Sequence, residues 1–110
     1  MSASACVAFY GLRFMILPDE IEDLEARTDP RQIAARRAGL ATYWGNFGGE
    51  NDGYVLFVGT KVAFLGPENA PASALPHKQM LQLMSDTMER LNVVGLAGDV
   101  GLYMEWQPDA

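Results

Sequence analysis

The sequence predicts a single α+β domain, and three observations lead to this prediction. The chain has 110 residues, which is the length of one domain. Apolar residues make up 49% of it, enough to build a hydrophobic core and to exclude general disorder. Segments rich in strand-forming residues alternate with segments of helical spacing. We therefore expect strands and helices to interleave in one domain over residues 1–110.

The first strand is predicted at residues 6–17, CVAFYGLRFMIL. This run is rich in strand formers and too evenly apolar for an amphipathic helix. Gly11 within it indicates a bulge or a close approach of two backbones. Arg13 is its only charged residue, so both sides of the strand are apolar. Such a strand is typical of a sheet that is covered on both faces.

Two helices are predicted next. Asp19 and Glu22 have the spacing of a capping box, which predicts a short helix to about residue 26. Asp29 and Pro30 then have the residue types of an N-cap and a first helical position. The second helix is expected to run to about Tyr43 and to be followed by a glycine-rich loop over residues 44–53.

A β-hairpin is predicted at residues 54–58 and 61–65. The two runs are apolar and rich in strand formers, and they flank Gly59 and Thr60. Glycine at the first position of a two-residue link is typical of a type II′ turn. Both faces of this hairpin are again apolar.

The last two elements are a helix at about residues 76–91 and a strand at residues 100–106. The strand alternates between apolar and other side chains, which predicts that Trp106 lies on its buried side. The helix carries apolar residues three and four positions apart. Its expected buried stripe consists of Met80, Leu81, Met84, Met88 and Leu91.

This order of elements predicts the ferredoxin-like split β-α-β-β-α-β fold, a four-stranded antiparallel sheet with helices on one face. Because helices would cover only one face of strands that are apolar on both, the second face needs another cover. We expect a second copy of the chain to supply it, which makes the protein a homodimer that associates through its sheet face. The alternative is that residues 44–53 and 66–75 fold back over that face.

Charge and cysteine content exclude several classes of protein. The net charge of −6 argues against a nucleic-acid binder, which needs a basic surface. No uninterrupted apolar stretch is long enough to span a membrane, and no signal peptide is recognisable, so we expect a cytoplasmic protein. Cys6 is the only cysteine, so neither an internal disulfide nor a zinc site is expected. Glu50, Asn51 and Asp52 lack the spacing of a calcium loop.

The arginines give the clearest indication of a binding site. Four of them fall within residues 27–37, which hold a single acid. Arg36 and Arg37 are followed by Tyr43 and Trp44, and forked guanidinium donors beside aromatic rings suit a carboxylate or phosphate on a planar ligand. The alternative, which we favour at this point, is that the arginines form ion pairs with acids of the preceding helix. Those acids are Glu20, Glu22, Asp23 and Glu25.

Two functional hypotheses follow, and a binding role is favoured over an enzyme. No nucleophile has a recognisable base, no metal or cofactor motif is present, and the sequence does not identify a substrate. The first hypothesis is an acidic homodimer that binds and regulates or neutralises a basic partner protein. The second is a small-molecule binding protein or enzyme that takes an anionic or aromatic ligand. Its pocket would be lined by Arg36, Arg37, Tyr43, Trp44 and His77.

Overall fold

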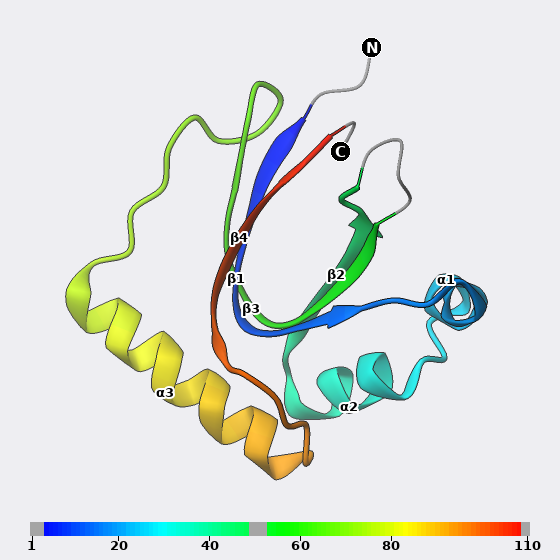
Figure 1. The fold of residues 1–110 in the computed structure, drawn as a ribbon. Helices are drawn as coiled ribbons and strands as arrows, with labels where there is room; N and C mark the ends of the chain where they lie inside the picture. The colour runs from blue at the N-terminus through cyan, green and yellow to red at the C-terminus, as the bar shows by residue number, and fades with distance from the viewer. Residues whose placement is uncertain (1–3, 49–52, 109–110) are drawn as a thin grey trace.

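The structure is a computed structural model that describes residues 4–48 and 53–108. Glu50, Asn51 and Asp52 of the expected glycine-rich loop lie outside the described residues. The described chain is a mixed α+β fold with a four-stranded antiparallel sheet and three α-helices (Figure 1), which confirms the predicted class. In chain order the elements are β1 (Ala5–Met15), a 3₁₀ turn (Pro18–Glu20), α1 (Ile21–Ala26), α2 (Pro30–Ala38), β2 (Ala41–Asn46), β3 (Tyr54–Leu65), α3 (His77–Val93) and β4 (Gly101–Gln107).

The strands lie in the order β2-β3-β1-β4, and every neighbouring pair is antiparallel. The long strands β1 and β3 pair with each other at the centre of the sheet. β4 pairs only with residues 5–11 of β1, and β2 pairs only with residues 54–59 of β3. The sheet therefore has three strands at each end, and a different edge strand completes each end.

The two central strands bend together where Gly11 pairs with Gly59. A Cβ atom on either glycine would lie 2.2 Å from a backbone carbonyl oxygen of the opposite strand, so only glycine fits at both positions. Both also have positive φ angles, 152° and 156°. The close backbone approach expected at Gly11 is confirmed. The predicted hairpin at Gly59-Thr60 is wrong, because β3 continues through it and bends instead of reversing (Figure 1).

This bend divides the sheet into two arms that face each other. The β4 arm consists of β4, residues 5–10 of β1 and residues 60–65 of β3. The β2 arm consists of β2, residues 12–15 of β1 and residues 54–58 of β3. Figure 1 shows both central strands curving through the bend, with α2 and α3 outside the curve.

The inner face of the bent sheet holds an aromatic cluster between the arms. Val7 and Phe9 from the β4 arm pack against Val55 and Phe57 from the β2 arm, and all four are at most 2% exposed. The rings of Phe9 and Phe57 are stacked with centroids 5.5 Å apart. Phe47, from the segment after β2, packs edge-on against Phe57.

Polar contacts also join the arms. Arg13 from the β2 arm forms an ion pair with Glu105 of β4, and the Tyr43 hydroxyl donates a hydrogen bond to Oε1 of Gln107. The second face of the sheet is therefore covered mainly by the sheet itself, with Phe47 as the contribution of the predicted covering loop. The argument for a dimer through this face is weakened, because Val7, Phe9, Val55 and Phe57 are already buried within one chain.

The outer face packs against the helices. Its buried cluster combines Leu12 and Leu56 of the central strands with Leu24 of α1, Ala35 of α2 and Leu91 of α3. The hydroxyl oxygens of Thr60 and Thr87 lie 2.6 Å apart and join α3 to the sheet beside the bend. This second core fixes the positions of α1 and α2 relative to the β2 arm.

The second helix ends earlier than the sequence predicts. Asp29 caps its start as expected, because its carboxylate accepts a hydrogen bond from the backbone N–H of Arg31 at 2.9 Å. Gly39 ends it with a left-handed C-cap (φ 72°), so the expected helix to Tyr43 is wrong. Residues 41–46 instead form the edge strand β2, which suits their aromatic and β-branched side chains.

The expected burial of α3 and β4 is wrong in part. Thr87 and Leu91 are buried, whereas Met80, Leu81 and Met88 remain 38–50% exposed. On β4 the apolar side is open: Leu102, Met104 and Trp106 are 52%, 65% and 58% exposed. The reason is that α3 reaches the sheet through its C-terminal half and leaves the outer face of β4 uncovered.

Candidate functional site

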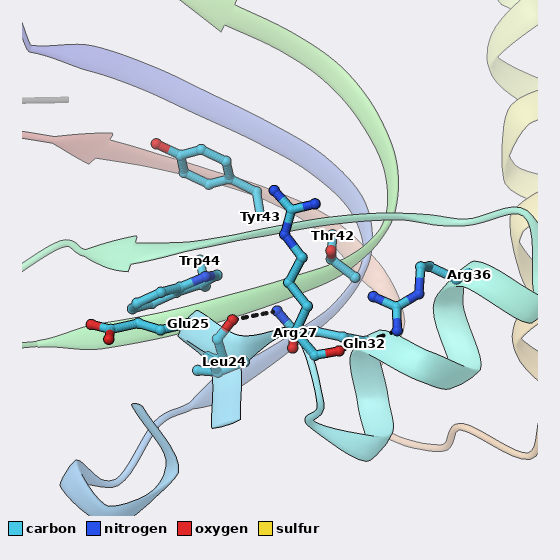
Figure 2. Close-up of a pocket in the computed structure, with 8 residues that line it drawn as sticks. All are labelled: Leu24, Glu25, Arg27, Gln32, Arg36, Thr42, Tyr43 and Trp44. Carbon is cyan, nitrogen blue, oxygen red and sulfur yellow. Dashed lines mark hydrogen bonds between the residues drawn. The ribbon is translucent and has the colours of Figure 1, made fainter. Parts of the chain in front are cut away.

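A pocket of about 560 Å³ lies between α1, α2 and the edge strand β2 (Figure 2). Three of the residues that the sequence predicted for a ligand site, Arg36, Tyr43 and Trp44, line it together. The pocket opens at the edge of the sheet, so side chains from both faces of β2 can reach it. Its lining consists of Leu24, Glu25, Arg27, Gln32, Arg36, Thr42, Tyr43 and Trp44.

The aromatic side of the pocket comes from β2. Trp44 packs against Tyr54 with ring centroids 6.2 Å apart, which holds the indole on the side of the helices. Tyr43 is held on the other side by its hydrogen bond to Gln107. Burial raises the pKa of the Tyr43 hydroxyl, and this hydrogen bond offsets part of the effect. The hydroxyl is therefore a neutral donor at pH 7 that is already engaged with Gln107. The Tyr43 ring packs edge-on against Phe64 and Phe47, with centroids 4.8 and 6.3 Å apart, so a ligand can contact only the ring surface that these residues leave uncovered.

The cationic side of the pocket comes from two arginines. Arg27 is the C-cap of α1 and has left-handed backbone angles (φ 61°, ψ 31°). Its side chain extends across β2 toward Tyr43 in Figure 2. Arg36 lies on α2, and its Nη2 donates a hydrogen bond to the backbone carbonyl of Arg27 at 3.1 Å. Within residues 4–48 and 53–108, neither guanidinium has a carboxylate within ion-pair distance.

Gln32 adds an unsatisfied acceptor to this pocket. The residue is 4% exposed, and its Nε2 donates a hydrogen bond to the carbonyl of Leu24 at 3.2 Å (Figure 2). Its Oε1 is buried without a hydrogen-bond partner in the described part of the chain. Rotating the amide would only place two oxygen atoms face to face, so the free atom is the oxygen. Buried acceptors of this kind are uncommon, and a bound water or ion can supply the missing partner.

The alternative ion-pair interpretation holds for Arg31. Its Nε and Nη2 donate to the two carboxylate oxygens of Asp29 at 2.9 and 2.8 Å, and Nη2 also donates to Glu20 at 2.8 Å. The hydrogen bonds from Arg31 hold the pKa of Asp29 below its usual value, against the opposing effect of burial. Arg31 therefore belongs to the scaffold that connects the 3₁₀ turn to α2.

The other two predicted residues lie outside this pocket. Arg37 follows Arg36 on α2 but lines a different hollow, between α2 and α3, with Asp86 and Glu89. His77 is exposed at the start of α3. The described residues contain no group of three or more side chains suited to hold a metal ion.

Sequence reasoning missed Arg27 and Gln32 as lining residues. Arg27 carried one usable signal, because an arginine stands where a helix usually ends on glycine. Gln32 was visible only as the third residue of α2, and nothing in the sequence showed that its acceptor would lack a partner.

Comparison with known proteins finds no matching family, no matching curated protein and no matching solved structure. In the described part of the chain, no helix is both long enough and apolar enough to span a membrane.

Proposed function

We propose that this chain is a small binding protein whose pocket holds a carboxylate or phosphate on a planar ligand. The observation that carries this proposal is the pair of guanidinium groups, Arg27 and Arg36, beside the rings of Tyr43 and Trp44. Guanidinium groups recognise planar anions through paired hydrogen bonds, and aromatic faces stack on flat ligands.

The test is a thermal-shift and calorimetric titration of the full chain with three probes: phenyl phosphate, benzoate and inorganic phosphate. We expect the aromatic anions to bind more tightly than inorganic phosphate, because only they can use Tyr43 and Trp44. Loss of one charge-assisted hydrogen bond costs about 1.5–3 kcal/mol. Arg36→Ala should therefore raise the dissociation constant by about tenfold or more.

Arg37→Ala is the matched control, since it removes the same charge from the next residue of the same helix but from a different hollow. It should bind the aromatic anions as the unaltered chain does. Equal losses in Arg36→Ala and Arg37→Ala would contradict the proposal, because they would reflect net charge instead of a site. Absence of any shift with all three probes would also count against it.

A second candidate function is supported by charge. The chain has a net charge of −6, and Glu22, Asp23 and Glu25 lie exposed on α1. We propose that this surface can bind a basic protein in the cytoplasm, in a regulatory or neutralising role. The affinity for such a partner should fall steeply as salt rises. A salt-independent interaction would contradict this candidate.

We also propose that the fold is the ferredoxin-like split β-α-β-β-α-β arrangement. Support comes from the strand order, because β3 lies between β1 and β2, as this arrangement requires. The division of the first crossover into α1 and α2, and the bend at Gly11 and Gly59, are additions to that plan.

A further inference from the structure

The edge strand β4 has unpaired backbone groups along one side. It is the last strand in the order β2-β3-β1-β4, so its outer N–H and C=O groups have no neighbouring strand among residues 4–48 and 53–108. Natural sheets protect such edges with lysine, proline or like charges. Residues 101–107 contain neither lysine nor proline, and their one charged residue, Glu105, is already paired with Arg13.

The outer face of β4 is apolar and open. Leu102, Met104 and Trp106 alternate along the strand, so all three project from the same face, and each is more than half exposed. The N-terminal half of α3 does not cover them, because the buried residues of that helix, Thr87 and Leu91, lie in its other half and its N-terminal end lies away from the strands (Figure 1).

Beside this face lies an apolar groove of about 330 Å³. It separates the N-terminal half of α3 from the β4 arm, and Leu102 lines its border with β4. The lining consists of Tyr10, Val62, Leu75, Met80, Leu83, Met84 and Leu102. Such a groove suits one large apolar side chain as an anchor.

The sequence of β4 fits a second copy of itself. An antiparallel pair of β4 strands related by a twofold axis at Met104 would match residues 101–107 along their whole length. Leu102 would then lie opposite the partner's Trp106, and Glu105 opposite the partner's Tyr103. No like charges meet in this register, and the large apolar side chains share one face. The partner's Trp106 would stand next to Leu102, at the border of the groove.

The exposed area is also of the right order. At their exposed fractions, Met80, Leu102, Met104 and Trp106 present on the order of 400 Å² per copy, which is half of the roughly 800 Å² that each partner contributes to a standard interface. The paired backbones and the rest of α3 would contribute the remainder.

We propose that two copies of this chain associate through β4 into one continuous eight-stranded sheet, in which each Trp106 enters the groove between α3 and the β4 arm of the other copy. The interface is isologous and closed, so it produces a dimer and not a fibre. It is independent of the arginine pocket, which lies on the β2 side of the molecule.

Sedimentation velocity of the full chain over a range of micromolar concentrations tests this proposal. The unaltered chain should be a dimer. Met104→Lys places two like charges at the twofold axis and should weaken association by about 100-fold or more. Trp106→Ala removes the anchor and should also give monomers. Both residues are exposed in the single chain, so far-UV circular dichroism should be unchanged.

Leu17→Lys is the matched control, because Leu17 is 62% exposed and lies outside the proposed interface. It should remain dimeric. In a Cys6→Ala background, Met104→Cys should form a disulfide-linked dimer under mild oxidation, and Leu17→Cys should not.

An unaltered chain that is monomeric throughout would overturn the proposal, whatever else the groove then binds. A dimer that survives Met104→Lys would overturn it too, because the interface would lie elsewhere. A dimer that is lost in Met104→Lys but kept in Trp106→Ala would overturn the assignment of Trp106 to the groove.

Discussion

Arg27 is the one non-glycine residue in the described chain with a positive φ angle. A left-handed backbone costs a residue with a Cβ atom about 1 kcal/mol or more, and helices that end this way usually carry glycine there. Residues held in strained backbone conformations cluster at binding and active sites. The Arg27 side chain lines the proposed anion pocket, so the residue with the strained backbone is also one of the proposed binding residues.

Arg27→Gly should therefore stabilise the protein while it weakens ligand binding. We expect a gain of about 1 kcal/mol, which corresponds to a rise of several degrees in melting temperature. Affinity for an aromatic anion should fall about tenfold or more, because one guanidinium is lost. Thermal unfolding and calorimetric titration measure the two effects. Arg27→Ala separates them: it should lose the affinity and gain no stability, and a gain in Arg27→Ala would contradict the role of strain.

Asp29 gives a pH dependence with a definite sign. Its pKa is lower in the folded chain than in the unfolded chain, chiefly because Arg31 donates to both of its oxygens. The ion pair therefore contributes stability that is complete above the usual pKa of about 4 and is lost as the pH falls through the folded pKa. Asp29→Asn keeps the helix cap and removes the charge, so it should cost about 1–2 kcal/mol at pH 7.

Urea unfolding of Asp29→Asn at several pH values measures this cost. The difference from the unaltered chain should shrink as the pH falls below 4. A difference that stays constant down to pH 2 would show that the carboxylate does not contribute through its charge.

At the scale of the elements, the bend at Gly11 and Gly59 determines the shape of the sheet. A methyl group on Gly59 would lie 2.2 Å from the carbonyl oxygen of Tyr10, and the φ angle is unfavourable for any other residue. Gly59→Ala should therefore destabilise the protein by about 3 kcal/mol, the combined cost of overpacking and backbone strain. Gly95→Ala is the control, because Gly95 has a φ of 71° but open space around it. It should cost only the strain, about 1 kcal/mol. Equal costs in urea unfolding would contradict the steric argument.

The same elements show how far the sequence predicts the fold. Periodicity identified β1, α1, α3 and β4, and the cap at Asp29 identified the start of α2, because these features are local. The capping box predicted at Asp19 and Glu22 is wrong, because the Glu20 side chain instead accepts a hydrogen bond from the backbone N–H of Leu17, ahead of the 3₁₀ turn. Gly59 was interpreted as a turn, since a glycine between two apolar runs looks the same whether the chain reverses or bends. Whether the chain reverses or bends at Gly59 depends on its pairing with Gly11, and this pairing joins segments that are distant in the sequence. Likewise, the sequence analysis missed β2, because its strand-forming residues begin only two residues after the Gly39 C-cap and were assigned to the end of the preceding helix.

The candidate site, like the fold, was predicted from the sequence only in part. Arg36, Tyr43 and Trp44 were identified as ligand-binding residues because arginines and aromatic residues stand close together in the sequence. Their separation from Arg37 depended on where α2 ends and which way its faces point, and the sequence placed that end about five residues too late, at Tyr43 instead of Ala38. The unsatisfied oxygen of Gln32 is a property of packing alone.

At the scale of the whole molecule, the strong bend of the sheet explains how strands that are apolar on both sides are covered on both faces. Strands that are apolar on both sides need cover on both faces. Here the helices cover the outer face, and each arm covers the inner face of the other. β1 and β3 run through both arms, so adjacent residues such as Leu56 and Phe57 belong to different cores. The two cores share their backbone and should not unfold separately.

Phe57→Leu tests this coupling. Phe57 is fully buried in the inner cluster, and the substitution keeps most of the volume, so we expect a loss of about 1–2 kcal/mol. Because the cores are joined, the urea midpoint should fall by the same amount when it is followed by far-UV circular dichroism, near-UV circular dichroism and the fluorescence of Trp44 in a Trp106→Phe background. Leu17→Ala, on the exposed surface, should leave the free energy of unfolding from each of the three probes unchanged within about 0.5 kcal/mol. If Phe57→Leu lowered the near-UV midpoint and left the Trp44 midpoint in place, the inner core would be a separate unit, and the bend would connect two independent structures.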